Sequence, residues 1–453
     1  HSPENPSIDT DIALSCTATD ENGMLDVQIF YHLGGSGVEK QLAMISSSGN
    51  TYETSIPAED VTINGLSYSI VGTDNRYNSM TTGPYSVNIS FSSGQLTSSM
   101  SGSALAGGVP LETWRMFSIP ATLDEGNSSK VLNDELGKRD VTTWELWTWN
   151  ENKWEYPSSL EPGKGYWLIQ WMDPSISIDP GSGATVDQTG FTFTLQPGWN
   201  MIGNPYPFET SLSLDQADYY GPITYGLIGE GWKNVNNSLL PWGGYVVYNK
   251  GSAPETITLN PAKTFQTLAR EQETAPDGWK LNIGAYGKTY IDPDNAIGRL
   301  SGSLEELDYR DNPEPPYMGG YVSVVMPRSE WNTNISHFTS DIRSLTEAEG
   351  VWDVELRVKE ETSPVTLSLD MEGDFPVENG IVLLDLINRD THHIKETSSV
   401  TLNQNWDKLP VYPFKVIAGS PEYVSSMTHE ILSQLPETFT LHQNYPNPFN
   451  PTT

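Results

Sequence analysis

The sequence predicts an all-β protein built of tandem antiparallel β-sandwiches. Short runs that alternate apolar and polar residues recur along the chain, and turn-forming residues separate them roughly every 8–12 positions. The 39 Gly and 32 Pro supply those turns, and segments with helical period are almost absent. Because 453 residues exceed what one hydrophobic core organises, about three domains are expected.

Residues 1–93 form the first expected domain. Val27, Ile29 and Tyr31 alternate with polar residues, which places one side of that strand in a core. About seven such strands, together with the segment GLSYSIVGTD at 65–74, resemble an immunoglobulin or fibronectin type III module. In secreted multidomain hydrolases, modules of this kind usually serve as spacers. The Ser/Gly-rich residues 94–108 are expected to be a linker.

Residues 109–263 contain an internal repeat, which predicts a duplicated β domain with copies at 109–185 and 186–263. The matching pairs are Trp114–Pro120 with Trp199–Pro205, and Leu160–Leu168 with Leu240–Tyr248. The second pair is more closely spaced than the first, which indicates a loop deletion between the copies. Neither copy is expected to bury its sheet alone, so each would pack on its twin.

A third sandwich is expected over residues 276–420, where Trp352–Val358 alternates cleanly. It would carry an acidic, Pro-rich loop from Asp292 to Pro316. Residues 421–436 would be a linker to the C-terminal segment 437–453.

The charge balance narrows the classes of partner. The chain has 24 Lys and Arg against 58 Asp and Glu, a net charge of −34, which argues against nucleic acid and anionic membrane surfaces. The best apolar run, Ile381–Ile387, is too short to insert into a membrane and contains Asp385. Cys16 is the only cysteine, so neither an internal disulfide nor a cysteine-based metal site can form.

The C-terminal residues 443–453 read QNYPNPFNPTT. They resemble the start of the sorting domain carried by type IX secretion cargo of the Bacteroidetes, without the strands that follow in that family. The resemblance implies recognition by type IX-like secretion machinery and a secreted or outer-surface location. The residues that carry it are Asn444, Pro446, Asn447, Pro448, Phe449, Asn450 and Pro451. The alternative is an extended Pro-rich linker, since each Pro restricts its own φ and the residue before it.

A run of tryptophans is the first candidate binding site. Six indoles lie between Trp144 and Trp171, and Trp147 with Trp149 would share one strand face. Exposed rings at Trp147, Trp149 and Trp154 would offer flat platforms for surface glycans. The alternative is packing in a core or between domains, where tryptophan buries a large area.

Asp292, Asp294 and Asn295 are the candidate metal ligands. Their oxygen atoms suit calcium, which is the one cofactor considered. The pattern fails the EF-hand test, because Ile297 and Ser303 occupy positions that require Gly and Glu. The alternative is local Asx-turn bonding within a loop.

No nucleophile elbow, P-loop or two-histidine zinc motif occurs, so no enzyme is expected in these residues. The leading hypothesis is a secreted, non-catalytic structural or adhesive region at the cell surface. One alternative is a self-assembling filament or surface-layer subunit. Others are a glycan-binding module, or the accessory tail of a larger secreted hydrolase, most plausibly a peptidase, with its catalytic domain upstream of His1.

Overall fold

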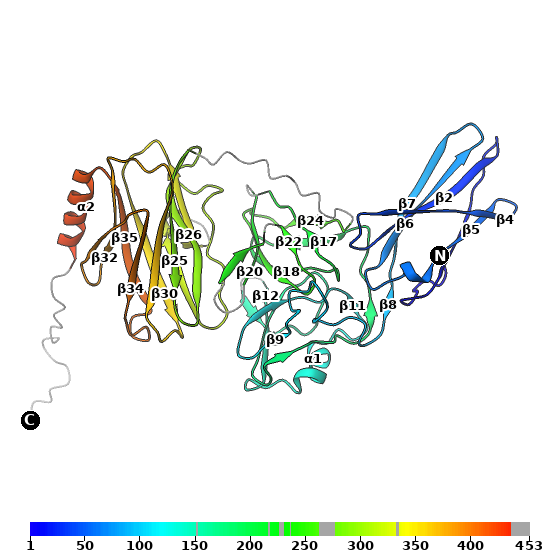
Figure 1. Ribbon diagram of the computed structural model, residues 1–453, viewed down its shortest axis with the longest axis horizontal. Coiled ribbons are helices and arrows are strands. Elements are labelled where there is room, and N and C mark those ends of the chain that lie inside the picture. The colour runs from blue at the N-terminus through cyan, green and yellow to red at the C-terminus, as the bar shows by residue number, and fades with distance from the viewer. Residues whose placement is uncertain are drawn as a thin grey trace, which may run out of the picture. The chain divides into compact units, whose positions relative to one another are not determined.

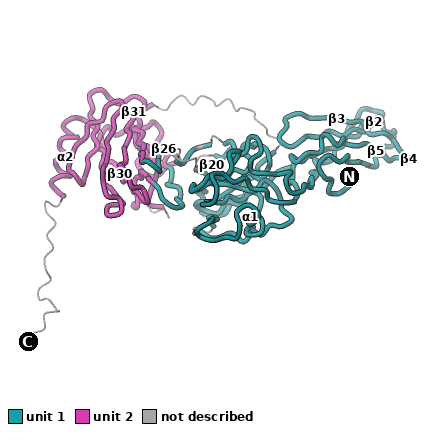
Figure 2. Tube along the Cα trace, turned by 60° about the horizontal axis from the view of Figure 1, so that its bottom comes forward, with its two compact units in different colours: residues 1–275, 288–294, 312–321 teal, residues 276–287, 295–311, 322–453 magenta. Residues whose placement is uncertain are grey.

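The computed structural model describes residues 1–150, 153–215, 218–225, 231–235, 237–261, 277–331 and 335–435. The all-β prediction is confirmed, because nearly all regular elements are strands in antiparallel sheets. The chain divides into two compact units (Figure 2). Unit 1 contains residues 1–275, 288–294 and 312–321, and unit 2 contains residues 276–287, 295–311 and 322–453.

The N-terminal module of unit 1 is a two-sheet sandwich (Figure 1). Its strands are β1 (Ile12–Thr17), β2 (Met24–Leu33), β3 (Glu39–Ala43), β4 (Ile45–Ser48), β5 (Thr51–Ile56), β6 (Leu66–Asp74) and β7 (Ser79–Val87). They form two antiparallel sheets in the orders β1-β5-β4 and β3-β2-β6-β7. The alternating residues Val27, Ile29 and Tyr31 of β2 all lie in its core.

Residues 94–108, expected to be a linker, instead pack into the core of the first repeat copy. Leu96 and Leu105 are each 1 % exposed and belong to that core. Ser98 is buried as well, and its hydroxyl accepts a hydrogen bond from the Ile178 amide. The Ser/Gly-rich composition therefore reflects tight turns between buried leucines.

The middle of unit 1 is an internally duplicated β domain. Strands β10 (Arg115–Phe117), β12 (Trp144–Asn150), β13 (Lys153–Glu155) and β14 (Tyr166–Gln170) form a sheet in the order β10-β14-β12-β13. Strands β18 (Gly198–Gly203), β20 (Tyr219–Tyr225), β21 (Trp232–Asn234) and β23 (Gly244–Asn249) form the matching sheet β18-β23-β20-β21. The same strand order in both sheets confirms the duplication.

Short strands complete the two copies. In the first copy, β9 (Val109–Pro110) pairs with β15 (Ser175–Ile176), and β16 (Gly183–Ala184) lies between β11 (Thr122–Leu123) and β8 (Ser90–Phe91) of the N-terminal module. In the second copy, β17 (Phe191–Leu195) pairs with β24 (Glu255–Leu259), and β19 (Thr210–Ser211) pairs with β22 (Ser238–Leu239). The first copy also contains helix α1 (Ser128–Leu136), whose N-cap Asn127 accepts a hydrogen bond from the Lys130 amide.

The two copies exchange reciprocal main-chain hydrogen bonds. The Ser118 amide donates to the Trp242 carbonyl at 3.0 Å, and the Gly203 amide donates to the Gly163 carbonyl at 2.9 Å. The strand registers place Tyr166 opposite Phe117 and Tyr245 opposite Ile202, so Tyr166 is equivalent to Tyr245. In this structural alignment Ser118 matches Gly203 and Gly163 matches Trp242, so one contact is made twice. This reciprocity is the mark of a two-fold-like interface, and the prediction that each copy packs on its twin is confirmed.

Unit 2 is a larger sandwich of two sheets. Their strands are β25 (Gly278–Tyr286), β26 (Ile291–Leu300), β27 (Tyr321–Pro327), β28 (His337–Phe338), β29 (Ser340–Ser344), β30 (Gly350–Lys359), β31 (Val365–Gly373), β32 (Gly380–Asp385), β33 (Thr391–His393), β34 (Thr397–Leu402) and β35 (Val411–Gly419). The sheet orders are β29-β26-β25-β31-β34 and β28-β27-β30-β35-β32-β33. The β26–β29 pair is parallel.

The second expected linker, 421–436, is helical over most of its length. Helix α2 (Pro421–Gln434) begins at the N-cap Ser420, whose hydroxyl accepts a hydrogen bond from the Tyr423 amide. Val424 is buried with Val382 and Ile417 of the six-stranded sheet. The segment is therefore docked on the sandwich. No helix among the described residues is long and apolar enough to cross a membrane.

Candidate functional site

The three candidate tryptophans lie on one sheet of the first repeat copy. Trp147 and Trp149 belong to β12, and Trp154 lies on β13 directly opposite Trp149. The rings of Trp149 and Trp154 meet edge to face, with centroids 4.9 Å apart. All three side chains are half-buried. The structure therefore brings Trp149 and Trp154 together.

The face that carries these rings is turned toward packing partners. Trp147 pairs in register with Trp167, which is 1 % exposed and meets Trp114 and Trp232 edge to face. The indole nitrogen of Trp149 is buried without a hydrogen-bond partner among the described residues. Half-buried rings in such a setting favour packing between the copies, and glycan binding at these residues stays a prediction.

The candidate calcium ligands lie on strand β26. The loop expected at these positions is wrong, because Asp292, Asp294 and Asn295 are all strand residues. Asp292 and Asn295 are buried whereas Asp294 is exposed, and the Asn295 side-chain amide donates to the Ile283 carbonyl at 3.2 Å. Over the described parts of the chain, no three His, Cys, Asp or Glu side chains gather into a potential metal site. Calcium binding stays a prediction.

The residues that resemble a sorting signal lie outside the described residues. These are Asn444, Pro446, Asn447, Pro448, Phe449, Asn450 and Pro451.

A feature that the sequence analysis missed lies at the tip of the β6–β7 hairpin. Tyr77 is 81 % exposed and has a φ of 65°, a left-handed conformation that a bulky residue rarely adopts. The buried carboxylate of Asp74 accepts hydrogen bonds from the amides of Arg76 and Asn78 and from the Asn78 side chain. These bonds, the one from the Asn78 side chain first, hold the pKa of Asp74 below its usual range.

The hairpin tip is also tied to the neighbouring β1–β2 loop. The Asn75 amide donates to the Gly23 carbonyl at 3.0 Å, and its side chain donates to the Asn22 carbonyl at 2.9 Å. The tip is therefore held in one shape despite its exposure. The sequence signal was present, because DNRYN places Tyr where Gly or Asn is usual in such a turn.

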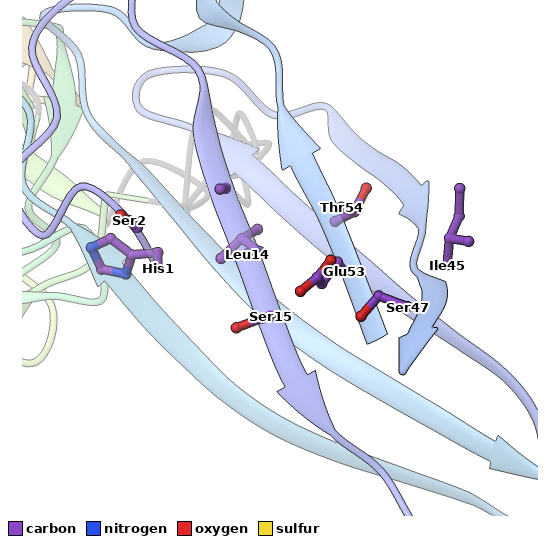
Figure 3. A pocket seen from close by; sticks show the side chains of 9 residues that line it. His1, Ser2, Leu14, Ser15, Ile45, Ser47, Glu53 and Thr54 are labelled. Atoms are coloured by element: carbon purple, nitrogen blue, oxygen red, sulfur yellow. The ribbon is translucent and has the colours of Figure 1, made fainter. Parts of the chain in front are cut away.

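The same module has a hollow on its three-stranded sheet (Figure 3). Its volume is about 610 Å³, within the range of small-ligand pockets. Figure 3 shows Ser15 on β1, Glu53 on β5, and Ile45 and Ser47 from β4 around it. Ile45 is 74 % exposed, so the hollow combines a carboxylate with an uncovered aliphatic side chain.

Comparison with known proteins gives no relative from which to transfer a function. No family model matches the chain, and neither a curated protein nor a solved structure matches it.

Proposed function

We propose that this chain is a secreted, non-catalytic structural region that presents adhesive surfaces outside the cell after export by a type IX-like pathway. The C-terminal segment QNYPNPFNPTT supports the export route through its resemblance to a sorting domain. The β-sandwiches support the structural role, because each of them presents loops and strand edges that can contact neighbours.

The observation that carries the structural role is main-chain pairing between the N-terminal module and the duplicated domain. Strand β8 pairs with β16, so that Phe91 lies opposite Gly183. Two residue pairs further, the Thr185 amide donates to the Ile89 carbonyl at 3.0 Å, and the Ile89 amide donates to the Thr185 hydroxyl at 2.9 Å. Such pairing is characteristic of a sheet and differs from the sparse contacts across a flexible domain linker.

A close contact between backbone and aromatic ring reinforces this junction. A Cβ on Gly34 or Gly35 would lie 2.7 Å from ring atoms of Phe208, so only glycine allows the approach. Phe208 in turn stacks on the buried Tyr206, with centroids 5.2 Å apart. The module and the repeat domain are therefore expected to move as one spacer.

The export proposal is tested on intact source cells. Antibodies raised against residues 1–261 should label unbroken cells or the culture medium, and external protease should remove that signal before lysis. Deleting residues 437–453 from the gene should leave the protein inside the cell. Retention of the full-length protein inside the cell would contradict the proposal.

The spacer is tested separately with Gly35→Leu, which would collide with Phe208, beside the matched control Gly49→Leu, which has open space around it. Only the first variant should make the junction susceptible to limited proteolysis. Equal cleavage of both variants would remove the case for a rigid junction.

A further inference from the structure

The N-terminal module exposes one arginine side chain that forms no ion pair with any described residue. Residues 1–93 contain only two basic residues, Lys40 and Arg76. Lys40 forms an ion pair with the buried carboxylate of Asp60. Arg76 is exposed at the hairpin tip, and its guanidinium has no ion-pair partner among the described residues. Of the module's two Lys and Arg side chains, Arg76 is thus the one without an ion pair in the described part of the chain, although the Asp74 carboxylate interacts with its charge.

Exposed apolar side chains lie in the same hairpin and on the neighbouring strand β2. Tyr77 is 81 % exposed, Met80 is 78 % exposed and Leu25 is 50 % exposed. Tyr and Arg are the residues most enriched among those that dominate protein interfaces. Because Asp74 and Asn75 already hold the tip in one conformation, little further ordering is needed when it binds. A left-handed Tyr costs stability relative to Gly, so its presence favours a role in binding.

The hollow on the same module has the complementary chemistry. Glu53 is exposed beside Ser15 and Ile45, and its carboxylate has no ion-pair partner among the residues that the structure describes. Ile45 provides an apolar wall that is 74 % exposed. The module therefore carries an exposed guanidinium beside the aromatic Tyr77 at one place. At another it carries an exposed carboxylate beside an aliphatic side chain, in a hollow that His1 also lines.

We propose that the hairpin tip of one chain docks into the hollow on the N-terminal module of a second copy. Arg76 would pair with Glu53, and Tyr77 would pack against Ile45. Contact between two different surfaces of the same module is heterologous, so it propagates from copy to copy unless a ring closes. The inference goes beyond the proposed export and spacer role: a strictly monomeric chain would overturn it and leave that role standing.

The test is sedimentation velocity of the full chain over a wide concentration range. The wild-type chain should associate, and association should weaken at high salt because the Arg76–Glu53 pair is solvent-accessible at the rim. Arg76→Glu and Glu53→Arg should each weaken association about tenfold or more through like-charge repulsion. The double variant restores opposite charges and should recover much of the wild-type affinity. A double variant no better than either single variant would overturn the pairing.

Tyr77→Gly separates binding from folding. Glycine is unstrained at a φ of 65°, so the variant should fold at least as stably as wild type. Its association should nevertheless fall about tenfold or more. Val38→Ser, at another position that is 62 % exposed, is the matched control and should associate like wild type. Equal association of the Tyr77→Gly and wild-type chains, or a wild-type chain that is monomeric at every concentration, would contradict the proposal.

Discussion

The two copies of the repeat adopt the same backbone at one position and place very different side chains there. Gly163 has a φ of 78°, and the matching Trp242 has a φ of 64°. A Cβ on Gly163 would lie 2.2 Å from a ring atom of Phe191 in the second copy. Trp242, by contrast, is fully buried in the core of the first copy. The duplication has kept the backbone, and at both positions it is a side chain of the second copy, Phe191 or Trp242, that packs on the first.

One hydrogen bond between a tyrosine hydroxyl and a turn amide is present in both copies. The Tyr166 hydroxyl accepts a hydrogen bond from the Glu161 amide at 2.8 Å, and the Tyr245 hydroxyl accepts one from the Leu240 amide at 2.6 Å. These contacts lie within each copy, whereas the Gly163 and Trp242 contacts lie between copies. The hydrogen bonds within the turns and the main-chain bonds between the copies therefore stayed the same, whereas the side-chain packing between the copies diverged.

The largest effect is expected from Trp242→Gly. Losing this buried side chain should destabilise unit 1 by about 3–5 kcal/mol, offset only in part by roughly 1 kcal/mol from relief of the left-handed conformation. Chemical denaturation followed by circular dichroism measures the change. Trp171→Gly, at a half-buried position, is the control and should cost less. A loss for Trp242→Gly below about 1 kcal/mol would mean that the first copy does not depend on the second.

Gly163→Ala probes the other half of the comparison. The methyl group would overlap the Phe191 ring and strain the backbone, so a loss of about 2–3 kcal/mol is expected. Gly49→Ala is the matched control, because it has a φ of 59° but open space around it. Its loss should be about 1 kcal/mol. Equal losses of unfolding free energy at the two glycines would show that the Phe191 ring moves aside and that its contact with Gly163 is not tightly packed.

Tyr166→Phe and Tyr245→Phe test whether the tyrosine-hydroxyl hydrogen bond contributes equally to stability in both copies. Each change leaves a main-chain amide without its acceptor and should cost about 1–2 kcal/mol. Thermal unfolding of the two variants and of the double variant measures this directly. Markedly unequal losses would break the equivalence of the two turns.

The smallest effect concerns pH, and it belongs to the first copy alone. Burial, followed by a hydrogen bond with Asp134, raises the pKa of Glu135 in α1 to about 8. The folded state therefore holds a proton that the unfolded chain releases near the ordinary value of 4.5. Stability contributed by this group should be full at acid pH and decline as pH rises to about 8.

Melting temperatures of wild type and Glu135→Gln between acid and mildly alkaline pH check this expectation. The variant should show a flatter profile over that window. Identical profiles would indicate that Glu135 ionises normally in the folded protein.

Much of the fold could be predicted from local patterns, and the failures have identifiable physical causes. The strands of the N-terminal module were predictable because alternation such as Val27, Ile29 and Tyr31 is local. Helix α2 was missed although Ser420 and Pro421 form a regular helix start, because the surrounding chain favoured a linker. For the candidate sites, the sequence picked out Trp149 and Trp154 but could not tell that their sheet face packs between copies.

The all-β class and the duplication follow from the amino-acid sequence alone, because alternation and repeated segments such as Trp114–Pro120 are properties of neighbouring residues. Which core each tryptophan enters depends on the three-dimensional fold. That Trp242 completes the other copy, and that Arg76 and Glu53 remain exposed on different faces of one module, depends on contacts between distant parts of the chain. No local sequence pattern carries that information, because close packing depends on how segments that are distant in the sequence fit against one another.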